Sequence, residues 1–186
     1  MVNRIQPGGR IDAHVDTEAH ADYWQRHHIV LKSQPGVVFR DISPLLAGRL
    51  RDTILALDAL FDAHEWAGIE AIVGVESRGF LLASALAFHR DRPLLLVRKP
   101  GKLPPPVERE AYDLEYGRDT LEMGTLLPPR RVLVVDDVIA TGGTLGATCA
   151  LCERAGHTVA GIAALIQLAA LNDFRWKATA PRWLFR

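Results

Sequence analysis

Short apolar runs alternate with longer segments of helical period along most of this chain. A run that is apolar at every position predicts a strand buried on both faces of a sheet, and apolar residues at every third or fourth position predict a covering helix. The alternation therefore predicts an α/β fold with a mainly parallel central sheet flanked by helices. The predicted strands lie at 71–75, 93–97, 132–135 and within 159–168.

Local signals place the ends of the predicted helices. Ser43 is a suitable N-cap residue, Pro44 fits the first helical position, and Gly156 suits the end of a helix. A weaker helical pattern precedes these signals, followed by a Pro-Gly turn and an extended segment. The predicted helices cover 17–31 (weakly), 43 to about 66, 79–89 and 143 to about 155, and the extended segment is 34–39.

Two segments interrupt the α/β alternation. Residues 1–16 are polar, with a Pro-Gly-Gly sequence, and we expect a flexible tail. Residues 99–117 contain four prolines and mixed charges, so we expect an exposed, mobile lid loop. We find no internal repeat, and a single domain over 1–186 is expected. The short apolar end at Trp183 suggests an edge strand or an interface.

Composition narrows the class of protein. The chain has 186 residues, 48% hydrophobic and 24% charged, which is typical of a globular domain that can bury a core. Its 22 basic and 22 acidic residues cancel, so nothing indicates a nucleic-acid-binding surface. Because the sequence contains neither a long apolar span nor a secretory leader, we expect a cytoplasmic protein outside the membrane. Cys149 and Cys152 fall within a predicted helix, where we expect packed thiols.

The sequence VLVVDDVIATGGT, at 132–144, is the most informative motif. Asp136 and Asp137 end an apolar strand, at the edge where open α/β sheets bind ligands. The following Thr-Gly-Gly-Thr opens a helix, and its backbone N–H groups can surround a phosphate. Like charges repel, so the two carboxylates must face something other than that phosphate, namely sugar hydroxyls or hydrated magnesium. The motif predicts a sugar-phosphate site.

Two further motifs follow predicted strands. Glu76-Ser77-Arg78-Gly79 comes directly after the strand 71–75, and its backbone and arginine can hold a second anion. Arg98, Lys99 and Lys102 place three cations within five residues at the start of the predicted lid. Cations that arrive with a closing lid stabilise the negative charge of a leaving group and exclude water.

These motifs resemble those of a known enzyme family. VVDDVIATGGT is similar to the phosphoribosyl pyrophosphate (PRPP) motif of type I phosphoribosyltransferases, and PGVVFRDISPLL, RKPGKLP and YDLEYG resemble segments of the adenine phosphoribosyltransferase family. Together the matches span about residues 34–171. The resemblance implies a type I phosphoribosyltransferase fold, with a lid at 99–117 and a small N-terminal hood at about 17–43. It also implies a cytoplasmic homodimer that uses Mg²⁺ in purine salvage, joining adenine and PRPP to give AMP and pyrophosphate.

The resemblance assigns residues to adenine and to catalysis. Main-chain groups of Val38 and Arg40 would read the Watson–Crick edge of adenine, a readout that disfavours 6-oxo purines. Glu115 would be the catalytic acid/base partner near N7 of adenine. Phe39 and Leu165 would line the base pocket, and Tyr116 would lie beside Glu115 on the lid.

The resemblance also assigns residues to PRPP. Asp136 and Asp137 would bind the ribose hydroxyls, and Mg²⁺ would bind through PRPP and water, with no direct protein ligand assigned. The peptide bond between Glu76 and Ser77 would be cis. The 5′-phosphate would be held by Ala140, Thr141, Gly142, Gly143 and Thr144, and pyrophosphate by Ser77, Arg78, Gly79, Arg98, Lys99 and Lys102.

Two alternatives stay open on the sequence. Family members commonly carry Glu where Gln167 stands, followed by a leucine and a Gly-Arg pair, and this chain departs from both features. One alternative is a phosphoribosyltransferase for another purine base. The other is a regulatory protein that binds PRPP without catalysis, which Glu115 and the intact lid motif argue against.

Overall fold

The computed structural model describes residues 29–34, 37–114, 117–168 and 173–185. The chain divides into two compact units, residues 1–56 and 57–186. The predicted tail at 1–16 and most of the weak helix at 17–31 lie outside the described residues.

A two-stranded antiparallel sheet precedes the first helix. Strand β1 (Ile29–Gln34) pairs with β2 (Val37–Asp41), with Val30 opposite Arg40. The extended segment predicted at 37–39 is confirmed, but the helical prediction at 29–31 is wrong. Ile29 and Val30 are β-branched and favour extended backbone, and two extended segments that flank a Pro-Gly pair can form a hairpin.

The helix predicted from residue 43 to about residue 66 is in fact two helices, α2 (Ser43–Asp58) and α3 (Ala63–Ala67). Asp62 ends the continuity because it caps α3: its carboxylate accepts from Glu65 N (2.8 Å), and its own N–H donates to Glu65 Oε2 (2.9 Å). At the start of α2, the Ser43 hydroxyl donates to Asp41 Oδ1 at 2.7 Å instead of capping the helix.

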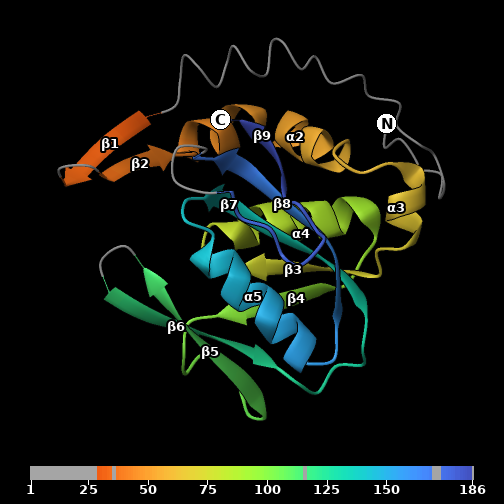
Figure 1. The fold of residues 1–186 in the computed structure, drawn as a ribbon. Coiled ribbons are helices and arrows are strands. Elements are labelled where there is room, and N and C mark those ends of the chain that lie inside the picture. Colours follow the sequence, from red (N-terminus) through yellow and green to blue (C-terminus); the bar gives the residue numbers. More distant parts are fainter. Residues whose placement is uncertain (1–28, 35–36, 115–116, 169–172, 186) are drawn as a thin grey trace. The chain divides into compact units, whose positions relative to one another are not determined.

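The second unit contains a seven-stranded sheet, in the order β5-β6-β4-β3-β7-β8-β9 (Figure 1). The strands from β4 to β9 in that order are parallel, and β5 and β6 form an antiparallel hairpin that joins β4. The predicted mainly parallel sheet is confirmed, and so is an edge strand at Trp183. The bounds are β3 (Ala71–Val75), β4 (Leu94–Arg98), β5 (Val107–Leu114), β6 (Gly117–Gly124), β7 (Arg131–Ile139), β8 (Thr158–Gln167) and β9 (Arg182–Phe185).

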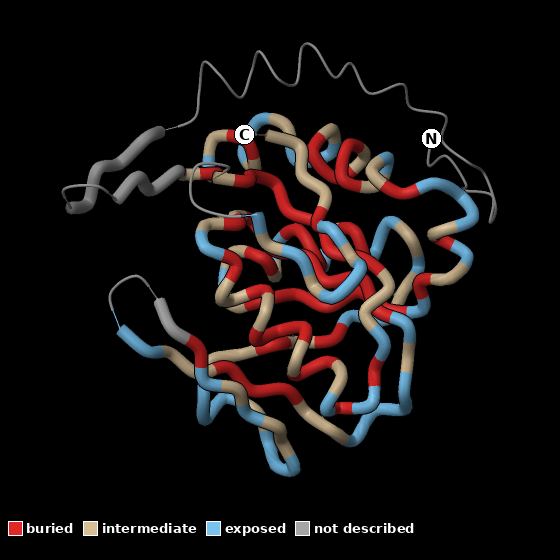
Figure 2. Tube along the Cα trace, in the orientation of Figure 1, coloured by how far each residue is buried: buried red, intermediate tan, exposed pale blue. Residues whose placement is uncertain are grey.

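Two helices cover opposite faces of this sheet, α4 (Gly79–Arg90) and α5 (Gly143–Arg154). Ala71, Val73 and Val75 of β3 belong to the same apolar cluster as Leu145 of α5. Gly74 faces α4, where a Cβ would meet Ala83 Cβ at 2.8 Å. Figure 2 shows buried residues along the central strands. In the described chain, the helices lack the length and apolar character needed to span a bilayer.

The lid loop predicted at 99–117 is only partly a loop. Residues 99–106 have no regular structure, but the prediction is wrong over 107–114, where β5 pairs with β6 along its whole length. Two of the charged residues in this segment have partners: Glu108 and Glu110, two positions apart on β5, both form ion pairs with Arg154 of α5. Charges at alternate strand positions share one face, so one arginine can serve both carboxylates.

Candidate active site

Three segments that carry predicted site residues follow neighbouring parallel strands. Strands β4, β3 and β7 are adjacent and parallel, with Val73 opposite both Leu95 and Val134. Their carboxyl ends therefore lie at one edge of the sheet, where open α/β sheets bind ligands. The segments that follow them, 76–79, 99–102 and 140–144, all belong to the second unit.

A pair of buried carboxylates lies toward the end of β7. The Asp136 and Asp137 residues are 8% and 6% exposed, and Asp136 Oδ1 accepts a hydrogen bond from the Asp137 N–H at 2.8 Å. Burial raises the pKa of Asp136 well above its ordinary value, and the neighbouring Asp137 charge raises it further. Burial also raises the pKa of Asp137, although Arg78, with Nη2 2.7 Å from Asp137 Oδ2, opposes that shift. Hydroxyl donors or a hydrated cation would stabilise the ionised pair.

Helix α4 begins against this carboxylate pair. A Cβ added to Gly79 would lie 2.7 Å from Asp136 Oδ1 and 3.1 Å from Val135 O, so only glycine lets the helix start so close to β7. The preceding peptide bond, between Glu76 and Ser77, is cis, as the family resemblance implied. The structure thus brings Arg78 and Gly79 together with the two aspartates.

The loop before α5 has the geometry of a phosphate cradle. Gly142 has φ +88°, in the left-handed region that favours glycine, and is the N-cap residue of α5. Its carbonyl accepts from Gly146 N at 2.8 Å, and a glycine has no side chain with which to cap the helix. The first-turn N–H groups of an α-helix have no partner within the helix, and a bound anion can satisfy them. Thr141 in this loop is exposed.

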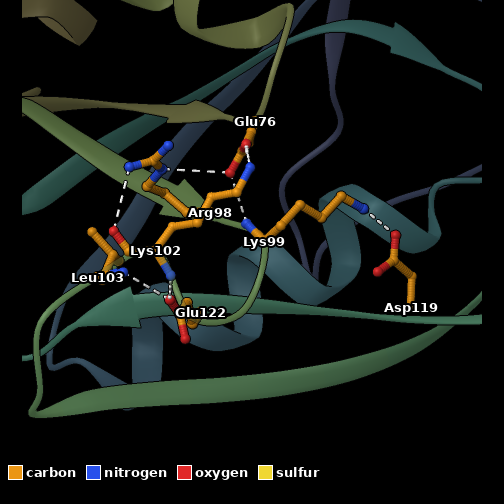
Figure 3. A network of polar contacts seen from close by, with 7 residues as sticks. All are labelled: Glu76, Arg98, Lys99, Lys102, Leu103, Asp119 and Glu122. Carbon is orange, nitrogen blue, oxygen red and sulfur yellow. Dashed lines mark hydrogen bonds and ion pairs between the residues drawn. The ribbon is translucent and has the colours of Figure 1, made fainter.

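The predicted cations are held by acidic residues, as Figure 3 shows. Glu76 Oε2 lies 3.4 Å from Arg98 Nε, and Glu76 Oε1 forms an ion pair with Lys102 Nζ. The Lys99 side chain instead forms an ion pair with Asp119 of β6, although its backbone N–H donates to Glu76 Oε2 at 2.9 Å. Two of the three predicted cations therefore meet beside the 76–79 segment, and the third side chain points elsewhere.

These pairings fix the charge state of Glu76. Burial by itself raises the pKa of this carboxyl, but hydrogen bonds from Lys102 and from the Lys99 backbone outweigh it, so the pKa lies below its ordinary value. The Asp119 pKa is also lowered: burial raises it, and the contacts with Lys99 and Thr120 more than compensate. Both groups are anions at neutral pH and neutralise the neighbouring cations.

Sequence reasoning did not single out Glu122 of β6. Its residue is 0% exposed, and its Oε1 accepts from the backbone N–H groups of Lys102 and Leu103, both at 2.9 Å. Arg109 Nε is 3.2 Å from its other oxygen. The sequence signal that could have identified Glu122 is a charged residue between two apolar ones, Leu121 and Met123. A charge in a buried strand needs polar partners.

The remaining predicted residues fall in different parts of the chain. Leu165 of β8 is fully buried. The backbone of Val38 and Arg40, on either side of Phe39, belongs to β2 in the first unit. Glu115 and Tyr116 lie outside the described residues.

Cys149 and Cys152 are buried, and burial raises the pKa of Cys152 to about 12, as expected for packed thiols.

The acidic donors suit magnesium bound mainly through a ligand. Within the described ranges, no group of three or more His, Cys, Asp or Glu side chains could form a metal cage. The acidic donors at the sheet edge are Asp136 and Asp137. Their burial raises both pKa values, and a nearby cation would favour their ionised forms. Mg²⁺ prefers oxygen ligands and keeps several of its waters, so these two carboxylates fit a hydrated ion held by a substrate's phosphates.

Comparison with known proteins agrees with this geometry. The family model described as "Phosphoribosyl transferase domain" matches residues 54–175. A curated adenine phosphoribosyltransferase of Hydrogenovibrio crunogenus is 50% identical over 141 residues, which cover 75% of this chain and 80% of that protein.

Solved structures extend the likeness to the fold. The adenine phosphoribosyltransferase of Rhodothermus marinus, 40% identical, has a TM-score of 0.79 over 90% of this chain and 98% of its own. The Giardia lamblia enzyme, solved with 9-deazaadenine, is 32% identical, with a TM-score of 0.78 over 90% of this chain and 97% of its own.

Proposed function

The chain belongs to the adenine phosphoribosyltransferase family, and on that premise we propose that it transfers the 5-phosphoribosyl group of PRPP to N9 of adenine, giving AMP and pyrophosphate. The observation that carries the transfer from PRPP is the meeting, at one sheet edge, of a buried carboxylate pair and the glycine-rich start of α5. The 9-deazaadenine bound by the Giardia relative supports adenine as the base. The reaction is one of purine salvage.

We assign the ribose and phosphate contacts by chemistry. Asp136 and Asp137 accept hydrogen bonds from the ribose hydroxyls, which lowers the cost of keeping two adjacent buried carboxylates ionised. The 5′-phosphate binds to the first-turn N–H groups of α5. The loop from Ala140 to Thr144 surrounds that phosphate, and pyrophosphate binds to Ser77, Arg78, Gly79, Arg98, Lys99 and Lys102.

The transfer needs charge stabilisation more than covalent chemistry. The C1′–O bond to pyrophosphate breaks as adenine N9 bonds to C1′ with inversion, and adenine loses a proton. Arg98 and Lys102 balance the negative charge that builds on the leaving group, and Mg²⁺, when bound with PRPP, would neutralise part of the same charge. Because pyrophosphate competes with Glu76 for these cations, its binding requires that the ion pairs of Glu76 open.

Base recognition and proton transfer belong to the other motifs. Backbone groups of Val38 and Arg40 read the Watson–Crick edge of adenine, and Phe39 and Leu165 contact the base. Glu115 acts as the acid/base partner near N7, with Tyr116 beside it. We further propose that the enzyme works as a homodimer in the cytoplasm.

Substitution of Glu115 tests whether the chain catalyses or only binds PRPP. Glu115→Gln removes the titrating group and keeps the size, so we expect turnover to fall by about 100-fold or more, in the range usual for general acid–base catalysis. The dissociation constant of PRPP, measured by calorimetry with Mg²⁺, should stay within about twofold, because Glu115 serves the base. The matched control is Glu110→Gln. Glu110 lies on β5, and its carboxylate pairs with Arg154 of α5. If Glu115→Gln turned over at the wild-type rate, the proposed acid/base role of Glu115 would be wrong.

A further inference from the structure

Segment 99–103 is held in two different ways. Its lysine side chains form ion pairs, Lys102 with Glu76 and Lys99 with Asp119. Its backbone is held by Glu122, whose Oε1 accepts from the N–H groups of Lys102 and Leu103 at 2.9 Å each (Figure 3). One residue therefore fixes the course of the chain, and the other two neutralise its charges.

We propose that Glu122 is a positioning residue for pyrophosphate binding: it holds the turn of the cation-bearing segment so that Arg98 and Lys102 face the 76–79 loop. The proposal rests on the proposed function, because it assigns these cations to the pyrophosphate of PRPP. Glu122 itself touches neither substrate nor the reacting atoms. It acts through the backbone to which Lys102 belongs.

The contacts require a carboxylate at this position. The Glu122 residue is 0% exposed, and the donors that converge on it are peptide N–H groups and the Arg109 guanidinium. Burial by itself raises the pKa of Glu122, but the backbone donors of 101–103 and Arg109 outweigh it and lower the pKa to about 2. A glutamine of the same size can keep its carbonyl oxygen on the N–H groups of Lys102 and Leu103, but it carries no charge and turns its NH2 group toward the Arg109 guanidinium, so a donor faces a donor and the turn is held less strongly.

Glu122 can keep its hold while a ligand is bound. An incoming pyrophosphate competes with Glu76 and Asp119, since these bind the charged ends of the lysines that the ligand needs. Glu122 binds none of those side-chain ends. The backbone can therefore stay in place while Lys102 exchanges Glu76 for pyrophosphate, and most of the ordering cost of the segment is met before the ligand arrives.

Glu122→Gln is the direct test, with Glu108→Gln as the matched control. Glu108 lies on β5 of the same hairpin, and its carboxylate pairs with Arg154 of α5. With Mg²⁺ present, we expect Glu122→Gln to raise the calorimetric Kd of PRPP and of pyrophosphate about tenfold, and the KM of PRPP in parallel. The KM of adenine should change less than about twofold, and Glu108→Gln should change all of these values less than about twofold. A general loss of structure would not separate the two substrates in this way.

A folded Glu122→Gln protein whose Kd for pyrophosphate and PRPP equals that of the wild type would overturn the proposal. Should that variant fail to fold, Glu122→Asp decides, because it keeps the buried charge and withdraws it from the turn by one methylene. We then expect the Kd of pyrophosphate to rise about threefold or more with adenine KM unchanged, and an unchanged pyrophosphate Kd would contradict the proposal. If wild-type protein binds pyrophosphate but forms no AMP from adenine, the proposed function fails, and the pyrophosphate titrations still decide the role of Glu122.

Discussion

At the scale of single residues, two glycines set how closely the sheet edge and its helices approach. Gly79 lets α4 begin against Asp136, and Gly142 turns the chain into α5 with φ +88°. A Cβ on Gly142 would also lie 2.7 Å from the Phe174 ring. The first-turn amides of α5, proposed to bind phosphate, and the carboxylate pair both depend on positions where any side chain is excluded.

Gly142→Val should therefore abolish PRPP binding. The substitution adds strain at a left-handed position and a collision with Phe174, which together displace the first turn of α5. Wild-type protein should show a higher Tm with PRPP and Mg²⁺, because a ligand that binds only the folded state stabilises it. We expect that increase to disappear in Gly142→Val. Gly124→Val, where a Cβ meets nothing within 4 Å, should keep it, and an undiminished increase in Gly142→Val would remove the cradle assignment.

The sequence predicts some residues of the site and misses others for a physical reason. Asp136, Asp137 and Gly142 stand within one short motif whose spacing already places carboxylates and amides at a strand end. Glu122 and Asp119 act on partners about twenty residues away, across the β4–β6 pair. Nothing in local spacing connects them, so only the folded chain reveals these contacts.

At the scale of elements, the buried strands are predictable and the polar ones are not. The apolar runs at β3, β4, β7 and β8 identify themselves, because a strand covered on both faces must be apolar throughout. Strand β5 carries charges that pair with Arg154, and its sequence has the composition of a loop. The break between α2 and α3 depends on the capping box of Asp62, which a continuous helical pattern conceals.

The turn from α5 into β8 should make stability depend on pH. His157 is 3% exposed, and its Nδ1 accepts from the Arg130 N–H at 3.1 Å, next to the start of β7. Burial lowers the pKa of His157, and the Arg130 charge lowers it further. The folded state thus binds fewer protons than the unfolded state, so stability is full above the unfolded pKa of about 6.5 and is lost as pH falls through the folded pKa.

The Tm measured from pH 7.5 down to pH 5 checks this dependence. We expect the Tm of the wild type to fall more steeply over that range than the Tm of His157→Gln, whose amide oxygen can still accept from Arg130 and does not titrate. His64→Gln, which removes an exposed histidine of α3, should leave the wild-type slope unchanged. Parallel curves for wild type and His157→Gln would contradict a pH-sensitive turn.

At the scale of the whole molecule, the geometry of the sheet edge indicates a sugar phosphate, and the likeness to known enzymes indicates the base. The strand order, the carboxylate pair and the helix start predict a sugar-phosphate site on chemical grounds. The identity of the base does not follow from those features. Adenine enters through the resemblance of the segment around Val38 and Arg40, and through relatives such as the Hydrogenovibrio enzyme, 50% identical. Base choice is therefore tested by direct measurement.

The most direct measurement is nucleotide formation from PRPP and Mg²⁺, run separately with adenine, hypoxanthine, guanine and xanthine. A site that offers a carbonyl to the 6-amino group and an N–H to N1 leaves mismatched donors and acceptors against a 6-oxo purine, a difference worth about 10⁴-fold or more where the groups are buried. We predict AMP from adenine and no detectable nucleotide from the other three bases. Comparable product from a 6-oxo purine would contradict the assignment of adenine as the base. No product from any of the four bases would contradict the proposed phosphoribosyl transfer.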